Sequence, residues 1–139
     1  MNHLCFIIIA LFFLVQQSLA EHPEEKCIRE LARTDENCIL HCTYSYYGFV
    51  DKNFRIAKKH VQKFKKILVT FGAVPKKEKK KLLEHIEACA DSANADQPQT
   101  KDEKCTKINK YYRCVVDGKI LPWNSYADAI IKFDKTLNV

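Results

Sequence analysis

Lysine dominates one stretch of the chain, residues 52–81. The stretch holds eleven lysines and one arginine against a single acid, Glu78, so it carries a net charge of +11. The whole chain of 139 residues carries +6, so the remainder sums to about −5. Ammonium groups gathered in this way bind phosphate and sulfate polymers by displacing their counterions. The candidate polyanion-binding residues are Lys52, Arg55, Lys58, Lys59, Lys63, Lys65, Lys66, Lys76, Lys77, Lys79, Lys80 and Lys81.

Apolar residues in the first half of this stretch follow the period of an α-helix. They are Phe54, Ala57, Val61, Phe64, Leu68 and Phe71. The spacing predicts a helix over 52–71 with one buried stripe, an N-cap at Asp51 and a stop at Gly72. The outer band of this helix would hold Lys52, Arg55, Lys59, Lys63 and Lys66. Lys58 and Lys65 would flank the band, whose length is about 21 Å at the helical rise.

A second helix is predicted after Pro75, a residue that suits the first turn of a helix. It opens with five lysines, at 76, 77, 79, 80 and 81. Five positive charges at a helix N-terminus oppose the helix dipole and repel one another. Stability alone does not account for this arrangement, which favours a binding role over the alternative that these lysines serve only solubility.

The N-terminus reads as a secretion signal. Residues 4–15 form a short apolar run, and the small residues Ser18 and Ala20 suit signal-peptidase cleavage before Glu21. The run is too short to span a membrane, and no later run is long enough. We therefore expect a signal peptide at 1–20 and one secreted domain at 21–139.

Six of the seven cysteines remain after Cys5 is removed with the signal. An even number of cysteines in a small secreted chain predicts three disulfides, and the count alone leaves 15 pairings open. Zinc is a poor alternative because no paired, closely spaced Cys/His quartet is present. We expect no metal and no cofactor.

The remaining segments also carry helical signals. Helices are predicted over 24–33, 38–47 and 102–116, and a last helix is capped by Asn124 or Ser125. Alternation of period two is absent, and the chain has only three glycines. The sequence therefore predicts an all-α, disulfide-stapled domain of about six helices.

Enzymatic motifs are absent from the sequence. The histidines after the signal, His22, His41, His60 and His85, are scattered one per element. Glycine-rich phosphate loops, Gly-x-Ser-x-Gly and His-Glu-x-x-His are missing, and the disulfides leave no thiol nucleophile. We expect a binding protein and no enzyme.

Two cysteine spacings, Cys38-x3-Cys42 and Cys105-x8-Cys114, resemble those of the insect odorant-binding protein superfamily. The resemblance implies an all-helical fold with disulfides Cys27–Cys42, Cys38–Cys105 and Cys89–Cys114. The chain departs from the usual pattern in the short segment between Cys27 and Cys38 and in a longer one between Cys89 and Cys105. The short first segment weakens the expectation of the usual enclosed ligand cavity.

These departures, with the lysine-rich middle and the C-terminal stretch around Trp123, resemble the small salivary odorant-binding-like proteins of phlebotomine sand flies. Those proteins are relatives of the mosquito short D7 proteins. The resemblance implies secretion from the salivary gland and interference with host haemostasis, by binding anionic surfaces and blocking contact activation of coagulation. Expected partners are heparin-like glycosaminoglycans, dextran sulfate and polyphosphate, and also host contact factors.

Two other functions stay open. The chain could carry a small ligand such as a biogenic amine or a lipid, because amines suit aromatic cages. The aromatic candidates for such a site are Tyr44, Tyr46, Tyr47, Tyr111, Tyr112 and Trp123. Alternatively, the basic surface could bind an acidic patch on a host protease or zymogen directly, with no anionic surface involved.

Overall fold

The computed structural model describes residues 21–139, so the predicted signal peptide at 1–20 lies outside the described residues. Six α-helices and two 3₁₀ turns make up this part of the chain, and it contains no strand. The prediction of an all-α fold of about six helices is confirmed. The elements are α2 (Pro23–Leu31), η1 (Glu36–Cys38), α3 (Ile39–Tyr47), α4 (Lys58–Thr70), η2 (Lys76–Glu78), α5 (Lys79–Ala95), α6 (Lys101–Val115) and α7 (Trp123–Asp134).

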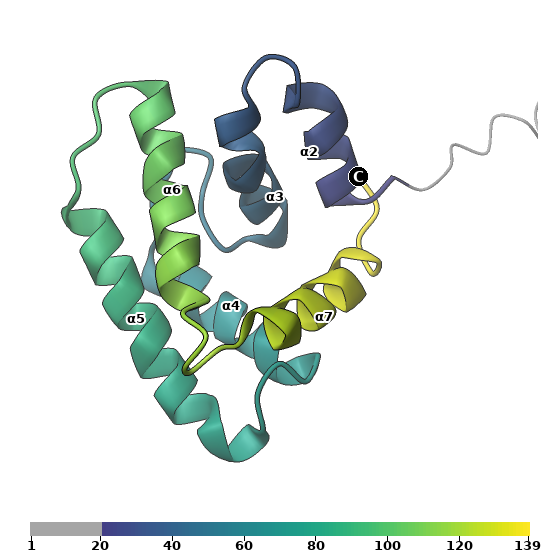
Figure 1. Ribbon diagram of the computed structural model, residues 1–139, viewed down its shortest axis with the longest axis vertical. Helices are drawn as coiled ribbons and strands as arrows, with labels where there is room; N and C mark the ends of the chain where they lie inside the picture. Colours follow the sequence, from purple (N-terminus) through teal and green to yellow (C-terminus); the bar gives the residue numbers. More distant parts are fainter. Residues whose placement is uncertain (1–20) are drawn as a thin grey trace, which may run out of the picture.

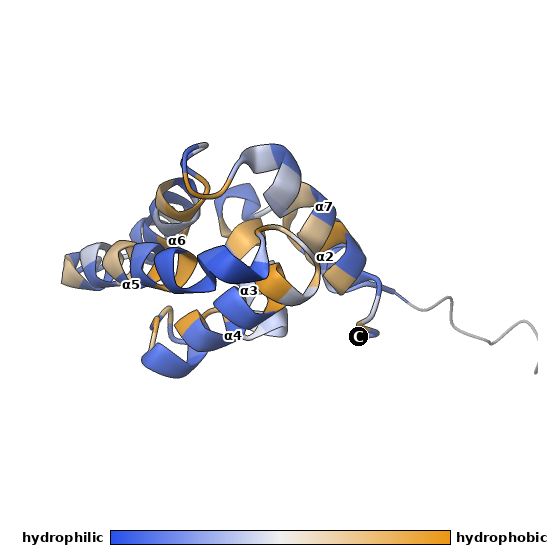
Figure 2. Cartoon of the chain, turned by 90° about the horizontal axis from the view of Figure 1, so that it is seen from below, coloured by the Kyte–Doolittle hydropathy of each residue, from blue (hydrophilic) through white to orange (hydrophobic). Residues whose placement is uncertain are grey.

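The helices enclose one core. The long helices α5 and α6 pack side by side, α2 packs on α3, and α4 crosses between α5 and α7 (Figure 1). Figure 2 shows hydrophilic and hydrophobic stripes on α4 and α5, as expected of helices that bury one face and expose the other. The lysine-rich segment is therefore a folded part of the domain.

Three disulfides staple the helices to one another. Cys27 of α2 bonds to Cys42 of α3, and Cys89 of α5 bonds to Cys114 of α6. A third bond joins Cys38, at the end of η1, to Cys105 of α6 across 67 residues of sequence. These are the three pairs that the family resemblance implies. Cys38 and Cys42 tie the start of α3 to two different helices.

Aromatic side chains fill the centre of the fold. Phe49 and Phe64 stack with ring centroids 4.1 Å apart, and Tyr44 meets both rings edge-on. Tyr47 packs against Phe49 and Phe133. All five side chains are buried, so α3, α4 and α7 share one aromatic cluster.

Helix α4 begins six residues later than predicted. Asp51 is not its N-cap: its Oδ1 atom accepts hydrogen bonds from the backbone N–H groups of Asn53 and Arg55, at 2.8 and 2.9 Å. This turn places Phe54 at a φ of 63°, with its ring stacked on His41 at 3.7 Å. Residues 52–57 are therefore a loop, because the Asp51 side chain binds its own following backbone and diverts the chain from a helix.

The predicted stop of α4 is confirmed. Gly72 has a φ of 81°, and the N–H of Ala73 donates to the carbonyl of Leu68 at 2.8 Å. This is the pattern of a glycine that ends a helix in the left-handed conformation. The predicted cap of the last helix is wrong: Pro122 occupies the N-cap position and α7 starts at Trp123. Proline without an N–H is well suited to a helix start, where that group lacks a partner.

The two ends of the described chain meet. The N–H of Val139 donates to the carbonyl of Glu21 at 3.1 Å, and His22 Nδ1 lies 2.8 Å from the carbonyl oxygen of Leu137. Figure 1 shows the C-terminus beside the start of α2. The segment after α7 thus closes the fold against its first helix.

Candidate polyanion-binding surface

Helix α4 carries lysines on two of its sides. Lys59, Lys63 and Lys66 lie within about 60° of one another on the helical wheel and form what we call the lysine ridge. Lys58 and Lys65 lie on a second side. Opposite the lysine ridge, Val61, Phe64 and Leu68 are buried in the core, as the sequence period predicts. The helix presents the lysines because its other face must bury apolar groups.

Lys52 and Arg55 do not belong to the ridge, because they lie in the 52–57 loop. Lys52 lines a small hollow beside α3 with His41 and Tyr46. Arg55 forms an ion pair with Asp51, with 3.2 Å between Nε and Oδ2. The lysines on α4 therefore extend only from Lys58 to Lys66, about 12 Å at the helical rise, and the predicted 21 Å band is wrong.

The second group of lysines surrounds the start of α5. We call Lys76, Lys77, Lys79, Lys80 and Lys81 the lysine cluster; all five are exposed on η2 and the first turn of α5. Within residues 21–139, only Lys80 of these five has an acidic partner, Glu84, at 3.9 Å. The structure thus brings two separate groups of ammonium charges onto adjoining helices.

Most of this charge is unpaired. Among the twelve basic residues of 52–81, only Arg55 and Lys80 form an ion pair within the described part of the chain. That leaves ten ammonium groups without an acidic partner there, and every one except Lys65 belongs to an exposed residue. Unpaired, exposed ammonium groups are free to exchange water and counterions for an external anion.

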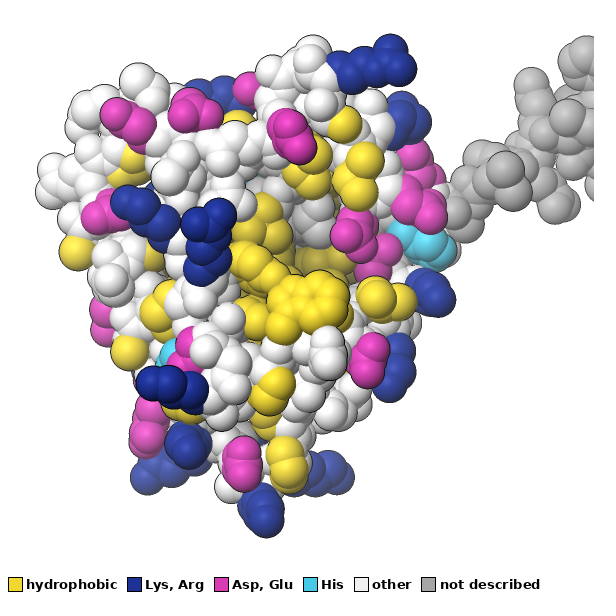
Figure 3. Space-filling model, in the orientation of Figure 1, with side chains coloured by type: hydrophobic (Ala, Val, Ile, Leu, Met, Phe, Trp, Pro, Cys, Tyr) yellow, Lys and Arg dark blue, Asp and Glu magenta, His cyan; other side chains and the backbone are white. Residues whose placement is uncertain are grey.

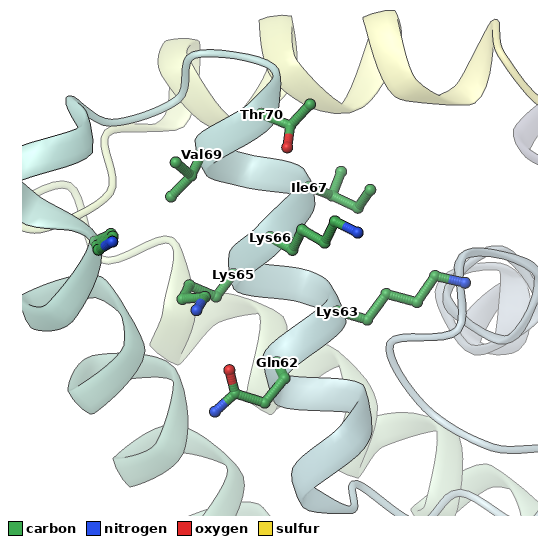
Figure 4. A pocket seen from close by; sticks show the side chains of 8 residues that line it. Gln62, Lys63, Lys65, Lys66, Ile67, Val69 and Thr70 are labelled. Carbon is green, nitrogen blue, oxygen red and sulfur yellow. The ribbon is translucent and has the colours of Figure 1, made fainter.

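A groove of about 580 Å³ lies along α4 and reaches the start of α5. We call it the basic groove; its lining residues are Gln62, Lys63, Lys65, Lys66, Ile67, Val69, Thr70 and Lys79. Figure 4 shows Lys63 and Ile67 pointing to one side of α4, and Gln62 and Lys65 pointing to the other, toward α5. The groove therefore brings lysines of α4 together with the first lysine of α5.

Lys63 has a second role. A Cβ atom built on Gly48 would lie 2.8 Å from the Nζ atom of Lys63, so the ammonium group covers this glycine at the end of α3. A positive charge at a helix C-terminus is favourable, since the last carbonyl groups carry partial negative charge. Lys63 therefore stabilises α3 as well as belonging to the lysine ridge, which its spacing in the sequence did not reveal.

The start of α4 depends on His60, a histidine for which the sequence predicts no site. His60 is only 6% exposed, and its Nδ1 atom accepts a hydrogen bond from the N–H of Ala57 at 2.9 Å. Burial, followed by the charge of Lys59, lowers the pKa of His60 from its ordinary 6.5. An acceptor at position N3 of a helix was the signal available in the sequence.

A separate hollow of about 510 Å³ lies between α3, α6 and α7. Its walls include Tyr44, Tyr47, Tyr112 and Trp123, and we call it the aromatic hollow. Figure 3 shows hydrophobic side chains gathered in this depression, with acidic groups near its rim. Of the other aromatic candidates, Tyr46 lines the hollow near Lys52 and Tyr111 is buried in the core.

Trp123 is the most exposed of the large hydrophobic side chains that line the aromatic hollow, at 61%. Its Nε1–H donates to the hydroxyl of Tyr112 at 3.1 Å, which holds the indole over the opening. Glu24 also lines the hollow, and burial, followed by the charge of Asp134, raises the pKa of its carboxyl from 4.5. An aromatic wall with a carboxylate at its edge suits an amphiphilic ligand.

The fold and the disulfide pattern are those of an insect binding protein. Residues 15–117 match the model of the PBP/GOBP family, and the chain belongs to this family. It is a family of binding proteins with an all-α fold. Within residues 21–139, no helix is both long and apolar enough to cross a membrane.

Several relatives are sand fly proteins. Ayaconin of Lutzomyia ayacuchensis is 32% identical over 131 residues, which cover 94% of this chain and 90% of the relative. Salivary proteins 15a and 15b of Phlebotomus duboscqi are each 34% identical over the full length of both chains. The predicted relationship to odorant-binding-like salivary proteins is confirmed.

Proposed function

We propose that this protein is secreted in saliva and binds anionic polymers and surfaces, and that it thereby blocks contact activation of host coagulation. The observation that carries the proposal is the set of ten ammonium groups on α4, η2, α5 and the preceding loop that have no acidic partner in residues 21–139. The salivary names of two relatives support the location.

The mechanism is ionic and multivalent. Each exposed ammonium group contributes little alone, about 1 kcal/mol or less. A polymer that meets the lysine ridge and the lysine cluster together gains from every contact, because the later contacts form within one complex. The release of condensed counterions drives binding and makes it depend on salt. A surface covered in this way is closed to zymogens that must assemble on it.

The first experiment measures retention of the protein on heparin across a salt series. The test variant carries Lys59→Gln, Lys66→Gln and Lys76→Gln, three exposed residues that form no ion pair with the rest of the described chain. Lys63 is left intact because its loss would also disturb the end of α3. We expect the slope of log affinity against log salt to fall by about 2 units, since each contact contributes roughly 0.7–0.9.

A matched control carries Lys119→Gln, Lys132→Gln and Lys135→Gln, which remove the same charge from exposed positions outside residues 52–81. This control should keep most of the wild-type slope. Equal losses in both variants would mean that net charge alone governs binding, and the proposed surface would be rejected.

Clotting assays connect binding to the biological role. Plasma clotting triggered by dextran sulfate or polyphosphate should be delayed by the wild type and much less by the test variant. The activity of purified contact proteases without a surface should not change. Inhibition of a purified factor in the absence of any surface would instead support direct binding of a host protease or zymogen.

A second candidate function is favoured by the aromatic hollow: carriage of a biogenic amine or a lipid. Trp123 is the only tryptophan in the chain, and it stands at the mouth of the hollow. Its fluorescence therefore reports directly on occupancy. Titration with serotonin, histamine and fatty acids, checked by calorimetry, should show saturable one-to-one binding if the chain is a carrier, and no change otherwise.

A further inference from the structure

We propose that the basic groove is a clamp for a short oxyanion segment, in which Lys65 of α4 and Lys79 of α5 hold linked phosphate or sulfate groups between the two helices. This inference rests on the proposed function, because the clamp would anchor one part of the polymer that the wider surface binds. The clamp would be a defined binding site within the wider basic surface, whose net charge alone indicates no particular site.

The positions of the two lysines carry the proposal. Lys65 is the one residue of the twelve that is partly buried, and its side chain lies on the side of α4 that faces α5 (Figure 4). Lys79 is the first residue of α5 and lines the same groove. Neither forms an ion pair in the described part of the chain, and the residues that line the groove include no acid. Two like charges from different helices converge on one hollow that lacks a counter-charge, and an oxyanion between them satisfies both.

The lining of the groove suits an oxyanion. The side chains of Gln62 and Thr70 supply an amide N–H₂ and a hydroxyl, which can donate hydrogen bonds to phosphate or sulfate oxygens. Val69 supplies an apolar wall on the side of α4 that faces α5 (Figure 4), and Ile67 lines the groove on the other side of α4. Apolar walls exclude water, and the attraction between an ammonium group and an anion strengthens as the local dielectric falls. The groove therefore combines charge, donors and partial exclusion of water.

The volume of the groove limits the ligand to a short segment. About 580 Å³ is the size of a small-molecule site, so the groove holds a few linked anionic groups and not a whole polymer. Lys59 is exposed on α4 but does not line the groove, so a rigid, flat lattice that rests on Lys59 does not reach into the groove beside Lys65. The clamp should therefore select flexible chains of closely spaced oxyanions, as found in polyphosphate and in sulfated glycans.

Calorimetry on the disulfide-bonded protein tests the clamp with short probes. The probes are tripolyphosphate and a trisulfated heparin disaccharide, with inorganic phosphate as the single-anion comparison. The clamp variant is Lys65→Gln with Lys79→Gln. The matched control, Lys59→Gln with Lys77→Gln, removes the same charge from α4 and from η2 but leaves the groove lining intact. Circular dichroism verifies that both variants fold.

We expect at least one short probe to bind more tightly than inorganic phosphate. The clamp variant should lose about tenfold in affinity for that probe, which is about 1.4 kcal/mol, and the control should lose less than about twofold. The better of the two probes identifies phosphate or sulfate chains as the source of the ligand. Equal losses in the two variants would overturn the clamp.

The clamp and the wider function fail in different ways. If long heparin binds to the wild type but neither short probe binds better than inorganic phosphate, the clamp is rejected and the proposed function stands. If long heparin does not bind to the wild type, both are rejected.

Discussion

The Nδ1 atom of His60 accepts a hydrogen bond from the backbone N–H of Ala57 at 2.9 Å, at the start of the helix that carries the lysine ridge. The bond requires that Nδ1 be unprotonated, so the neutral ring has its proton on Nε2. The neighbouring charges of Lys59, Arg55 and Lys63 oppose protonation, and that of Asp51 favours it. The start of α4 is thus coupled to the ionisation of one buried ring.

The first prediction concerns pH. Burial, followed by the charge of Lys59, places the pKa of folded His60 below its ordinary 6.5. The unfolded chain then binds the proton more readily, so this contribution to stability is fully present above the unfolded pKa. It is lost as the pH falls through 6.5 toward the folded pKa. Urea unfolding between pH 8 and pH 5 should show the free energy of unfolding decreasing with acidity.

The control for this pH dependence is His60→Gln, because glutamine at N3 can still accept from the cap N–H but does not titrate. His41, whose pKa burial also lowers, contributes in the same direction and remains in both proteins. The variant should therefore lose only part of the pH dependence. An unchanged slope would contradict the role of His60.

The second prediction compares two glycines. Gly48→Ala and Gly72→Ala each place a side chain at a positive φ, 73° and 81°, at a cost of about 1 kcal/mol. Only at Gly48 does the new Cβ meet the Nζ atom of Lys63, at 2.8 Å. We expect the Gly48 variant to unfold at the lower temperature of the two, because it also displaces the ammonium group from the end of α3. Equal melting temperatures would mean that Lys63 contributes nothing there.

The third prediction concerns the buried carboxylate of Asp134. Its Oδ1 atom accepts hydrogen bonds from the hydroxyl of Tyr47 at 2.8 Å and from the N–H of Glu24 at 3.2 Å. Tyr47→Phe removes one donor from a buried charge and should cost about 2 kcal/mol. Tyr46→Phe, at the exposed neighbouring position, is the control and should change stability by less than about 0.5 kcal/mol. Denaturant unfolding of both variants measures the two losses of stability, and equal losses would contradict the role of the Tyr47 hydroxyl.

The fourth prediction ranks two disulfides. The Cys38–Cys105 bond closes a sequence separation of 67 residues, and Cys27–Cys42 closes 15. In the loop-entropy account, removing them costs about 4 and about 3 kcal/mol. Replacing each pair with alanine and measuring thermal unfolding should therefore show the larger loss for Cys38–Cys105. The reverse order would indicate that the denatured chain is already compact around η1 and α6.

The sequence correctly predicted the part of α4 in which the apolar residues with helical spacing lie on an actual helix. Val61, Phe64 and Leu68 recur with helical spacing and are buried. Phe54 and Ala57 continue the same spacing by coincidence, since the chain there is a loop held by the side chain of Asp51. An aspartate before a polar residue is equally suited to an N-cap and to a turn, so the sequence could not distinguish them.

The candidate site was predictable in composition but not in arrangement. The run of lysines shows that charge gathers on residues 52–81, and the disulfide spacings point to the family. The meeting of Lys65 with Lys79 depends on how α4 packs on α5, and the contact of Lys63 with Gly48 depends on how α4 crosses the end of α3. Such pairings are set by tertiary packing, which spacing along one helix does not encode.

The hydrogen bond between Val139 and Glu21 brings the two ends of the described chain next to each other. A linker of three or four residues, about 10 Å when extended, is long enough to join these ends. New ends can then be opened in the connection at 96–100, between α5 and α6, without cutting a helix. A circular permutant of this kind keeps all three disulfides and leaves the lysine ridge intact. The new ends of the permutant lie away from the contact between Glu21 and Val139. A label or a surface anchor can therefore be attached at the new ends without breaking that contact.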